Sequence, residues 1–175
     1  MNKAYQTCIE LIQQRGYEID DNDDERILAT RINQFTGEEE QICVFLTKTS
    51  KFNVDSIAEF ISSLQKMEVS HCIIVYKDNA TPVAKKIVDE SKDLRIELFD
   101  ESELQYNITR HEIVPKHEIA YKKGTKDCVE WKKKYSDNFP ILLSNDPICR
   151  FYGYDKGDVI KVTRKNGYVT FRIVR

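Results

Sequence analysis

The sequence predicts an α+β protein of two domains, because its 175 residues change character between residues 100 and 108. Upstream of this boundary, apolar stretches alternate between strand and helix periods, whereas downstream two strand-like stretches close the chain around Asn166-Gly167. Charge divides at the same place, since residues 1–104 carry 12 Lys/Arg against 21 Asp/Glu and residues 105–175 carry 15 against 8. We therefore expect domains at 1–104 and 105–175, without a Gly/Ser linker.

Two helices are predicted at the start of the chain, over residues 2–15 and 22–33. The first would end at Gly16, which suits a helix cap, and its apolar side chains at helical spacing are Tyr5, Cys8, Ile9 and Ile12. The second begins in the acidic run 23–25, which would stabilise the positive end of a helix dipole. It would bury Ile27, Leu28 and Ile32.

An alternation of strands and helices follows, which predicts an α/β layer with parallel crossovers. The expected order is strand 42–46, helix 54–67, strand 71–76, a helix opened by Thr81 and Pro82, and strand 94–98. The strands are apolar runs too short for helices. Thr81 suits an N-cap, and Pro82 suits the first residue of a helix.

The C-terminal part predicts a helix at 126–135 and a terminal β-hairpin of strands 158–164 and 168–174. Asn166-Gly167, flanked by β-branched and aromatic residues, is the strongest short-range signal for such a hairpin. Alternation along the last strand would put Val169, Phe171 and Ile173 on one face and Tyr168, Thr170 and Arg172 on the other.

Composition argues against disulfide frameworks, structural zinc sites and membrane spans. The five cysteines are scattered and never in Cys-x-x-Cys spacing, so we expect most of them to be small buried apolar groups. The sequence contains no run of about 18 apolar residues and no signal-peptide core after Met1. We therefore expect an intracellular protein without a membrane partner.

Motifs for nucleotide, hydrolase and metal chemistry are missing from the sequence, so we expect no cofactor. There is no Gly-x-x-x-x-Gly-Lys-Ser/Thr loop, no Gly-x-Gly-x-x-Gly fingerprint and no Gly-x-Ser-x-Gly elbow. His111-Glu112 recurs as His117-Glu118, but a helical zinc site needs histidines four apart, and Pro115 interrupts this stretch. The simpler interpretation is an extended connector whose polar side chains satisfy the neighbouring backbone.

A basic cluster surrounds Trp131. Its lysines are Lys122, Lys123, Lys126, Lys132, Lys133 and Lys134. They could contact nucleic acid through phosphates while the indole stacks on a base, or they could form a solvated helix face, with Asp127 and Glu130 diluting the charge. A steep dependence of binding on salt would favour the first interpretation.

Several blocks of the chain, in one order and at similar spacing, resemble the small subunit shared by the eukaryotic nuclear RNA polymerases I, II and III. In the first domain these blocks are Arg15-Gly16-Tyr17, Ile73-Ile74-Val75 and Thr81-Pro82-Val83-Ala84-Lys85. In the second they are Asn107-Ile108-Thr109, His111 to His117, Asp146-Pro147, Arg150-Phe151-Tyr152-Gly153, Lys156-Gly157-Asp158-Val159 and Lys161-Val162-Thr163-Arg164. The resemblance covers nearly the whole chain and both domains of the eukaryotic type, whereas the archaeal homologue has only the C-terminal one.

The resemblance implies a non-catalytic subunit of DNA-directed RNA polymerase whose C-terminal assembly domain docks on the largest subunit. The residues it implies at this interface are His111, Pro115, Asp146, Pro147, Arg150, Tyr152, Gly153, Gly157 and Val159. Simple packing within the small domain is the alternative role for each of them. A nuclear location follows for a cellular protein, and a cytoplasmic virus factory or virion for a viral one.

The resemblance also implies an N-terminal jaw domain beside downstream DNA. Thr81 and Pro82 would lie nearest the duplex, because a helix N-terminus presents N–H groups to phosphate, although an ordinary capped helix start is the alternative. The net charge of the first domain opposes close approach elsewhere, so this contact would be weak. A free-standing adaptor that binds polymerase or a regulator exchangeably is the alternative function.

The chain departs from the family in length, with a short turn at 164–168 and a shorter jaw around 36–50. These differences suggest a divergent lineage, such as a large DNA virus or a reduced eukaryote. The family's jaw is similar in fold to restriction-endonuclease-like nucleases, which hold Mg²⁺ with carboxylates near a lysine. Strand 42–46 carries no acid, and if Lys48 were that lysine, Leu46 would occupy the carboxylate position. We therefore expect neither a metal site nor nuclease activity.

Overall fold

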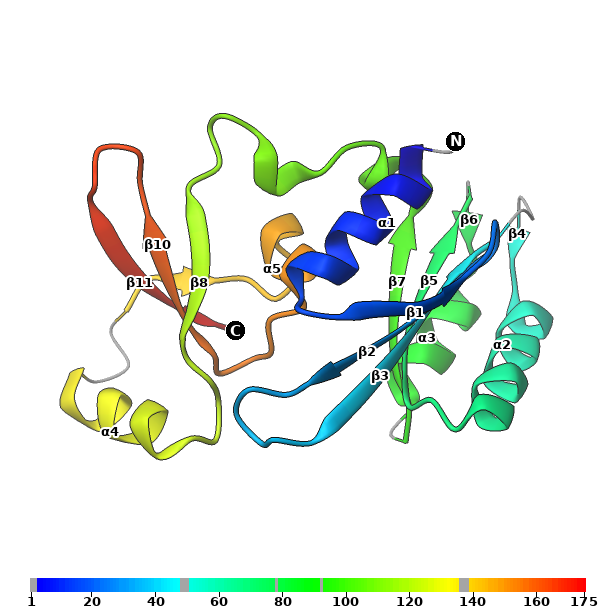
Figure 1. Ribbon diagram of the computed structural model, residues 1–175, viewed down its shortest axis with the longest axis horizontal. Coiled ribbons are helices and arrows are strands. Elements are labelled where there is room, and N and C mark those ends of the chain that lie inside the picture. Colours follow the sequence, from blue (N-terminus) through cyan, green and yellow to red (C-terminus); the bar gives the residue numbers. More distant parts are fainter. Residues whose placement is uncertain (1–2, 48–50, 78, 92, 136–138) are drawn as a thin grey trace. The chain divides into compact units, whose positions relative to one another are not determined.

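The computed structural model describes residues 3–47, 51–77, 79–91, 93–135 and 139–175 (Figure 1). These residues form two compact units, Met1–Tyr106 and Asn107–Arg175. Among the described residues, no helix is long and apolar enough to span a membrane.

The N-terminal unit is built on a mixed sheet with the strand order β1-β2-β3-β5-β7. These strands are β1 (Glu18–Asn22), β2 (Arg26–Ile32), β3 (Glu39–Leu46), β5 (His71–Tyr76) and β7 (Arg95–Asp100). The first three pair antiparallel, and β3, β5 and β7 are parallel. Their crossovers contain α2 (Val54–Met67) and α3 (Pro82–Glu90), which confirms the predicted α/β layer.

The predicted helix over 22–33 is wrong, because this segment contains the turn of a hairpin and strand β2. The Asp23 side chain accepts hydrogen bonds from the N–H groups of Glu25 and Arg26, both at 2.8 Å, so the acidic run orders a turn. Ile27 and Ala29 are fully buried with Leu28 half-buried between them, which is the two-residue period of a strand.

Local signals explain the helix ends. The helix α1 (Lys3–Gln14) ends before Gly16, whose φ of +81° confirms the predicted cap, and the Tyr17 N–H donates to the Ile12 carbonyl at 3.1 Å. Asn53 caps α2 through its side chain. Smaller elements complete this unit: β4 (Lys51–Phe52), which pairs with β6 (Asn79–Ala80), and the 3₁₀ turn η1 (Glu101–Leu104).

The core of this unit lies on both faces of its sheet. On the face toward α2 and α3, buried side chains of β3 and β5 pack with those of the two helices: Cys43, Phe45, Cys72, Ile74, Ile57, Leu64, Ala84 and Val88. The alternate strand residues Ile42, Val44 and Ile73 are equally buried. Burial on both faces explains why β5 is a continuous apolar run rather than an alternating one.

The C-terminal unit contains a four-stranded sheet with the order β8-β10-β11-β9. Its strands are β8 (Lys116–Tyr121), β9 (Ile141–Leu142), β10 (Val159–Thr163) and β11 (Val169–Val174). The helix α4 (Lys126–Tyr135) and the hairpin of β10 and β11 confirm the predictions, and Gly167 takes φ +81° in the turn. The 3₁₀ turn η2 (Ile108–Arg110), β8 and the helix α5 (Pro147–Tyr152) were not predicted.

The two helices of this unit pack with different side chains of the sheet. Cys128 and Trp131 of α4 pack with Val159 and Ile173, and Phe171 joins them, as the predicted alternation of the last strand requires. Cys149 of α5 packs with another set, Leu142, Tyr154, Ile160, Val162 and Val174. Because neighbouring strand residues point to opposite faces, α4 and α5 cover opposite faces of the sheet.

All five cysteines are free and buried, which confirms their predicted role as small apolar groups. Burial raises the pKa of the Cys8, Cys43 and Cys72 thiols to about 12, so these groups stay neutral.

Candidate functional site

Five of the nine predicted interface residues belong to α5 and its two caps. The Asp146 side chain accepts a hydrogen bond from the Ile148 N–H at 2.8 Å, and Pro147 takes the first helical position. At the other end, Gly153 adopts the left-handed conformation (φ 65°), and its N–H donates to the Arg150 carbonyl at 3.1 Å. Capping at both ends fixes a helix that would otherwise be too short to be stable.

The outer face of α5 is the part available to a partner. Ile148, Cys149 and Phe151 are buried in the domain. Pro147 is exposed, whereas Arg150 and Tyr152 are half-buried, and the Tyr152 ring stacks on Tyr154 with centroids 5.2 Å apart. We call Asp146, Pro147, Arg150, Tyr152 and Gly153 the α5 surface. It presents a planar cation and an aromatic ring on a rigid element.

The connector that holds His111 and Pro115 lies next to α5, because η2 contacts that helix. His111 is exposed, and its Nδ1 accepts a hydrogen bond from the Ile113 N–H at 3.3 Å. His117 Nδ1 donates to the Pro115 carbonyl at 2.8 Å, and burial is the main reason that the pKa of His117 is lowered. Both histidines therefore bond to neighbouring backbone, as the simpler interpretation of the His-Glu pairs predicts.

The remaining two predicted interface residues lie toward α4. Val159 is fully buried in the core with Cys128 and Trp131. Gly157 has a φ of +98°, which an L side chain rarely adopts, and its carbonyl accepts a hydrogen bond from Lys132 Nζ at 2.7 Å. These two residues shape the domain rather than offer a side chain to a partner.

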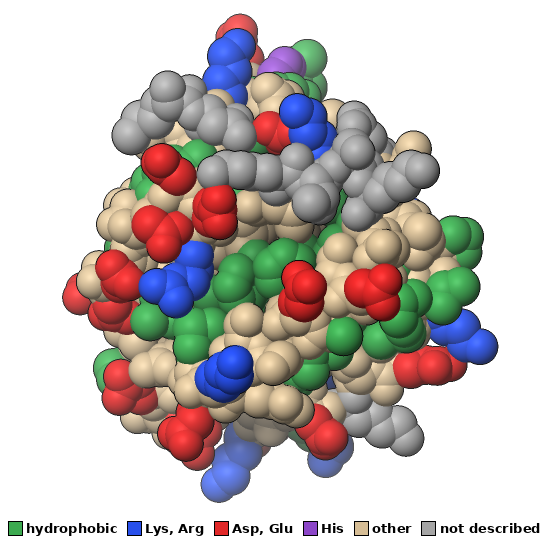
Figure 2. Space-filling model, turned by 90° about the vertical axis from the view of Figure 1, so that its right-hand side faces the viewer, with side chains coloured by type: hydrophobic (Ala, Val, Ile, Leu, Met, Phe, Trp, Pro, Cys, Tyr) green, Lys and Arg blue, Asp and Glu red, His purple; other side chains and the backbone are tan. Residues whose placement is uncertain are grey.

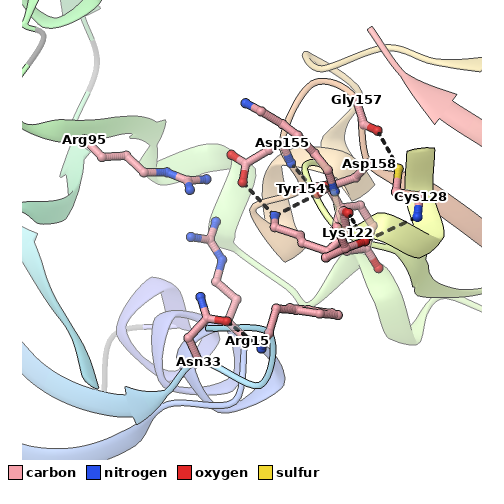
Figure 3. A network of polar contacts seen from close by, with 12 residues as sticks. Arg15, Asn33, Arg95, Lys122, Cys128, Tyr154, Asp155, Gly157 and Asp158 are labelled. Atoms are coloured by element: carbon pink, nitrogen blue, oxygen red, sulfur yellow. Dashed lines mark hydrogen bonds and ion pairs between the residues drawn. The ribbon is translucent and has the colours of Figure 1, made fainter. Parts of the chain in front are cut away.

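A buried ion pair that was not predicted fixes the loop after α5 (Figure 3). Asp158 is fully buried, and its carboxylate accepts hydrogen bonds from the Lys123 N–H, the Asp155 N–H and Lys122 Nζ, each at 2.9 Å. Lys122 Nζ also donates to the Asp155 carboxylate at 2.7 Å. The network ties residues 155–158 to the end of β8. In the sequence, the sign of this ion pair is an acidic residue that follows Gly157 at the start of a predicted strand, within a basic domain.

These contacts also change the interpretation of the basic cluster. Lys122 and Lys132 donate to internal acceptors, so their charges are committed within the domain. Lys123, Lys126, Lys133 and Lys134 are exposed. The surface available for phosphate is therefore less basic than the six lysines suggest.

In the N-terminal unit, Thr81 and Pro82 start α3 as predicted. Thr81 Oγ1 accepts a hydrogen bond from the Ala84 N–H at 3.2 Å, and the Thr81 N–H donates to the Phe52 carbonyl at 3.1 Å. Pro82 and Val83 are exposed. Figure 2 shows an apolar area, bordered by more acidic than basic side chains, on the face of this unit that carries α2. The excess of acidic side chains on that face disfavours phosphate.

Leu46, the residue expected at the carboxylate position of a nuclease, is half-buried, and its N–H donates to the Glu25 carbonyl at 2.7 Å. The nearby Asp23 carboxylate is used by the turn described above. The two acids of β3, Glu39 and Glu40, lie at the other end of the strand, where Glu40 accepts hydrogen bonds from Arg31 and Asn33. Lys48, the candidate lysine, lies outside the described residues. Among the described residues, no group of three His, Cys, Asp or Glu side chains is arranged to hold a metal ion.

Comparison with known proteins divides the chain as the structure does. Residues 106–174 match the family "RNA polymerase Rpb5, C-terminal domain", and residues 3–108 match the family "Restriction endonuclease". Both matches agree with the fold expected for the two domains.

Relatives of known role are similar over most of the chain. Subunit rpabc1 of DNA-directed RNA polymerases I, II and III from Dictyostelium discoideum is 33% identical, over 77% of this chain and 72% of its own. A putative DNA-directed RNA polymerase subunit of Invertebrate iridescent virus 6 is 30% identical, over 99% of both chains. Subunit 5B of RNA polymerases IV and V from Arabidopsis thaliana is 27% identical, over 98% of this chain and 88% of its own.

Proposed function

This chain belongs to the Rpb5 family of RNA polymerase subunits, with an N-terminal unit of the restriction endonuclease family, and we propose how its two units serve a polymerase. The C-terminal unit docks on the largest subunit, and the N-terminal unit lies beside downstream DNA. The chain itself is a non-catalytic subunit. The observation that carries the proposal is the similarity to the putative polymerase subunit of Invertebrate iridescent virus 6 over 99% of both chains.

The α5 surface supports the docking part of the proposal. Arg150 and Tyr152 are of the residue types that most often anchor protein interfaces, and both are half-buried, so their side chains lose little freedom on binding. Pro147 adds an exposed apolar group beside them. The buried pair of Lys122 and Asp158 holds the loop that follows, so the partner meets a preformed surface.

The start of α3 limits the proposed contact with the downstream duplex to a weak one. Pro82 has no N–H, and Thr81 Oγ1 already satisfies the Ala84 N–H, so few backbone donors remain for phosphate. The N-terminal domain also carries 12 Lys/Arg against 21 Asp/Glu. The contact is therefore peripheral, and it guides the duplex rather than binding it.

The location of the chain in the cell follows from the kind of polymerase to which it belongs. A polymerase like those of the cellular relatives would place the chain in the nucleus. The length of the match to the iridescent virus protein and the short turn at 164–168 favour a viral origin, which would place the chain in a virus factory or virion.

Reconstitution with the largest subunit tests the proposal. The chain is co-expressed with the C-terminal region of the largest polymerase subunit from the same host or virus, and the mixture is resolved by size exclusion at high salt. We expect a 1:1 complex that is lost in Arg150→Glu/Tyr152→Ala. Arg164→Glu makes the same charge change at an exposed position of the hairpin turn and should leave the complex intact.

Two results would contradict the proposal. No complex with the wild-type chain would remove the docking claim. A complex that exchanges freely at high salt would indicate the adaptor function instead of a resident subunit.

A further inference from the structure

A groove of about 590 Å³ runs along α4, on the face of the C-terminal sheet opposite α5. Aromatic rings line most of it: Tyr121, Trp131, Tyr135, Phe139 and Phe171. Its charged side chains are Asp127, Glu130 and Lys134. We call this the aromatic groove. Its volume lies in the range of ligand-binding pockets, and the proposed function does not use it.

The aromatic rings form the base and the sides of the groove. Trp131 is only 8% exposed, and its centroid lies 4.5 Å from Phe139, 5.4 Å from Tyr135 and 5.6 Å from Tyr121. Tyr135 is 47% exposed, so part of its ring is accessible to an incoming group beside Lys134. Packing between the rings fixes their orientation, so the groove is formed before anything binds.

The charges of the groove select a cationic occupant. Asp127 and Glu130 are exposed and stand three residues apart on α4, so their carboxylates share one side of the helix. Neither makes an ion pair or a side-chain hydrogen bond among the described residues. Lys134 Nζ lies 5.1 Å from the Tyr135 centroid, which is a geometry in which an aromatic ring attracts an ammonium group. The groove therefore combines ring faces with two carboxylates and one ammonium group, so its charged side chains are acidic on balance.

We propose that the aromatic groove binds a peptide segment of a partner protein through an arginine side chain. A planar guanidinium stacks on aromatic rings and bonds to carboxylates, so it matches both features of the groove, whereas a purely apolar segment would leave the two carboxylates unpaired. A nucleic acid strand could stack on the same rings and meet one lysine, Lys134, but the two carboxylates of Asp127 and Glu130 would repel its phosphates. The inference stands independently of the polymerase assignment.

Intrinsic fluorescence tests the proposal, because Trp131 is the only tryptophan of the chain. The full chain is titrated into the millimolar range with the capped peptide Gly-Leu-Arg-Leu-Gly. A second peptide carries citrulline in place of arginine, which keeps the planar group and removes the charge. We expect a saturable change in emission with the arginine peptide and binding at least about fivefold weaker with citrulline.

Variants locate the binding site. Asp127→Asn/Glu130→Gln and Tyr135→Leu change exposed side chains, so the fold should persist, and each should weaken binding of the arginine peptide severalfold. Glu118→Gln removes an exposed carboxylate outside the groove and should change nothing. Equal binding of the two peptides, insensitivity to the groove variants, binding of oligo(dT) in place of peptide, or no binding at all would overturn the proposal.

Discussion

The Glu97 carboxylate is the centre of a cluster of charged and titratable side chains in the N-terminal unit. Its carboxylate accepts two hydrogen bonds from Arg15, at 2.9 and 2.8 Å, and lies 2.7 Å from His71 Nε2. Burial alone would raise the pKa of Glu97, but the Arg15 guanidinium and His71 hold it well below its ordinary value. Arg15 directly follows α1, so this ion pair attaches the end of the helix to β7.

His71 makes the stability of this unit depend on pH. Burial lowers the pKa of His71 from 6.5, with smaller lowering effects of Arg95 and Arg15, and the hydrogen bond to Glu97 opposes the shift. The unfolded chain therefore takes up the proton first as pH falls below about 6.5, and the free energy of unfolding decreases from that point. We expect His71→Gln to show a shallower loss between pH 6.5 and 5.5 in urea unfolding.

Exposed His111 supplies the control for this experiment. His111→Gln should keep the wild-type decline, because that side chain lies at the surface of the other unit. Protonation of Glu97 lowers the free energy of unfolding only at a lower pH, since its ordinary pKa is 4.5 and its folded pKa is lower still. A His71→Gln variant with the full wild-type decline would show that this histidine is not the group responsible.

Asp158 is the residue on which the loop after α5 depends. In Asp158→Asn the amide nitrogen cannot accept the hydrogen bonds that one carboxylate oxygen accepts now, and Lys122 loses a fully buried partner. We expect the free energy of unfolding to fall by about 2–3 kcal/mol. The measurement is urea unfolding followed by Trp131 emission.

Asp155→Asn is the matched change at a more exposed carboxylate. The Asp155 side chain is 32% exposed, and Lys122 keeps Asp158, so the loss should stay below about 1 kcal/mol. Equal effects of the two variants would mean that the buried carboxylate has no special role.

At the scale of elements, strong local signals could be read from the sequence. The bounds of α2, β5 and α4 match their predictions to the residue, because caps and continuous apolar runs mark them. The segment 22–33 was misread because acids before an apolar stretch suit a helix start and a turn equally well. Its pairing with β1 and β3, which the pattern within the segment does not reveal, decided for the strand.

Part of the candidate site could also be predicted from the sequence. Asp146-Pro147 and Gly153 are the start and stop signals of a short helix, so α5 could have been predicted from the same signals as α3. The burial of Val159 could not be predicted, because it depends on the packing of α4 over the hairpin. Nor could two of the three donors around Asp158 be predicted, because Lys122 and Lys123 are distant from it in the sequence.

The N-cap of α5 gives a prediction at this scale. Asp146→Ala removes the acceptor for the Ile148 N–H, and we expect a loss of about 1 kcal/mol in the free energy of unfolding, with weaker docking on the largest subunit. Asp146→Ser keeps a capping oxygen and should retain both properties. Urea unfolding and size exclusion measure them. If the alanine variant docked as tightly as the wild-type chain, α5 would not be part of the interface.

At the scale of the molecule, the charge division sets what each unit can approach. The first domain carries more acids than bases, and the second carries more bases than acids. Repulsion therefore opposes strong contact with DNA through the first domain, and the contact that we propose at the start of α3 would be local.

The contact at α3 is tested in the assembled polymerase. Thr81→Ala/Pro82→Ala removes the cap and the exposed ring, and we expect a shorter lifetime of the open promoter complex, by about twofold, with unchanged assembly. Glu118→Gln, at an exposed position of the C-terminal unit, serves as the control. An unchanged lifetime in the double variant would remove the DNA contact from the account.

Stoichiometry in the native polymerase tests the central claim most directly. Tagged wild-type, Arg150→Glu/Tyr152→Ala and Arg164→Glu chains are expressed in the natural host or infected cell, and each is purified at high salt and quantified against the largest subunit. The account predicts one copy of the wild-type and Arg164→Glu chains per largest subunit, and loss of the double variant. Polymerase recovered without the wild-type chain, or with the double variant at full stoichiometry, would contradict it.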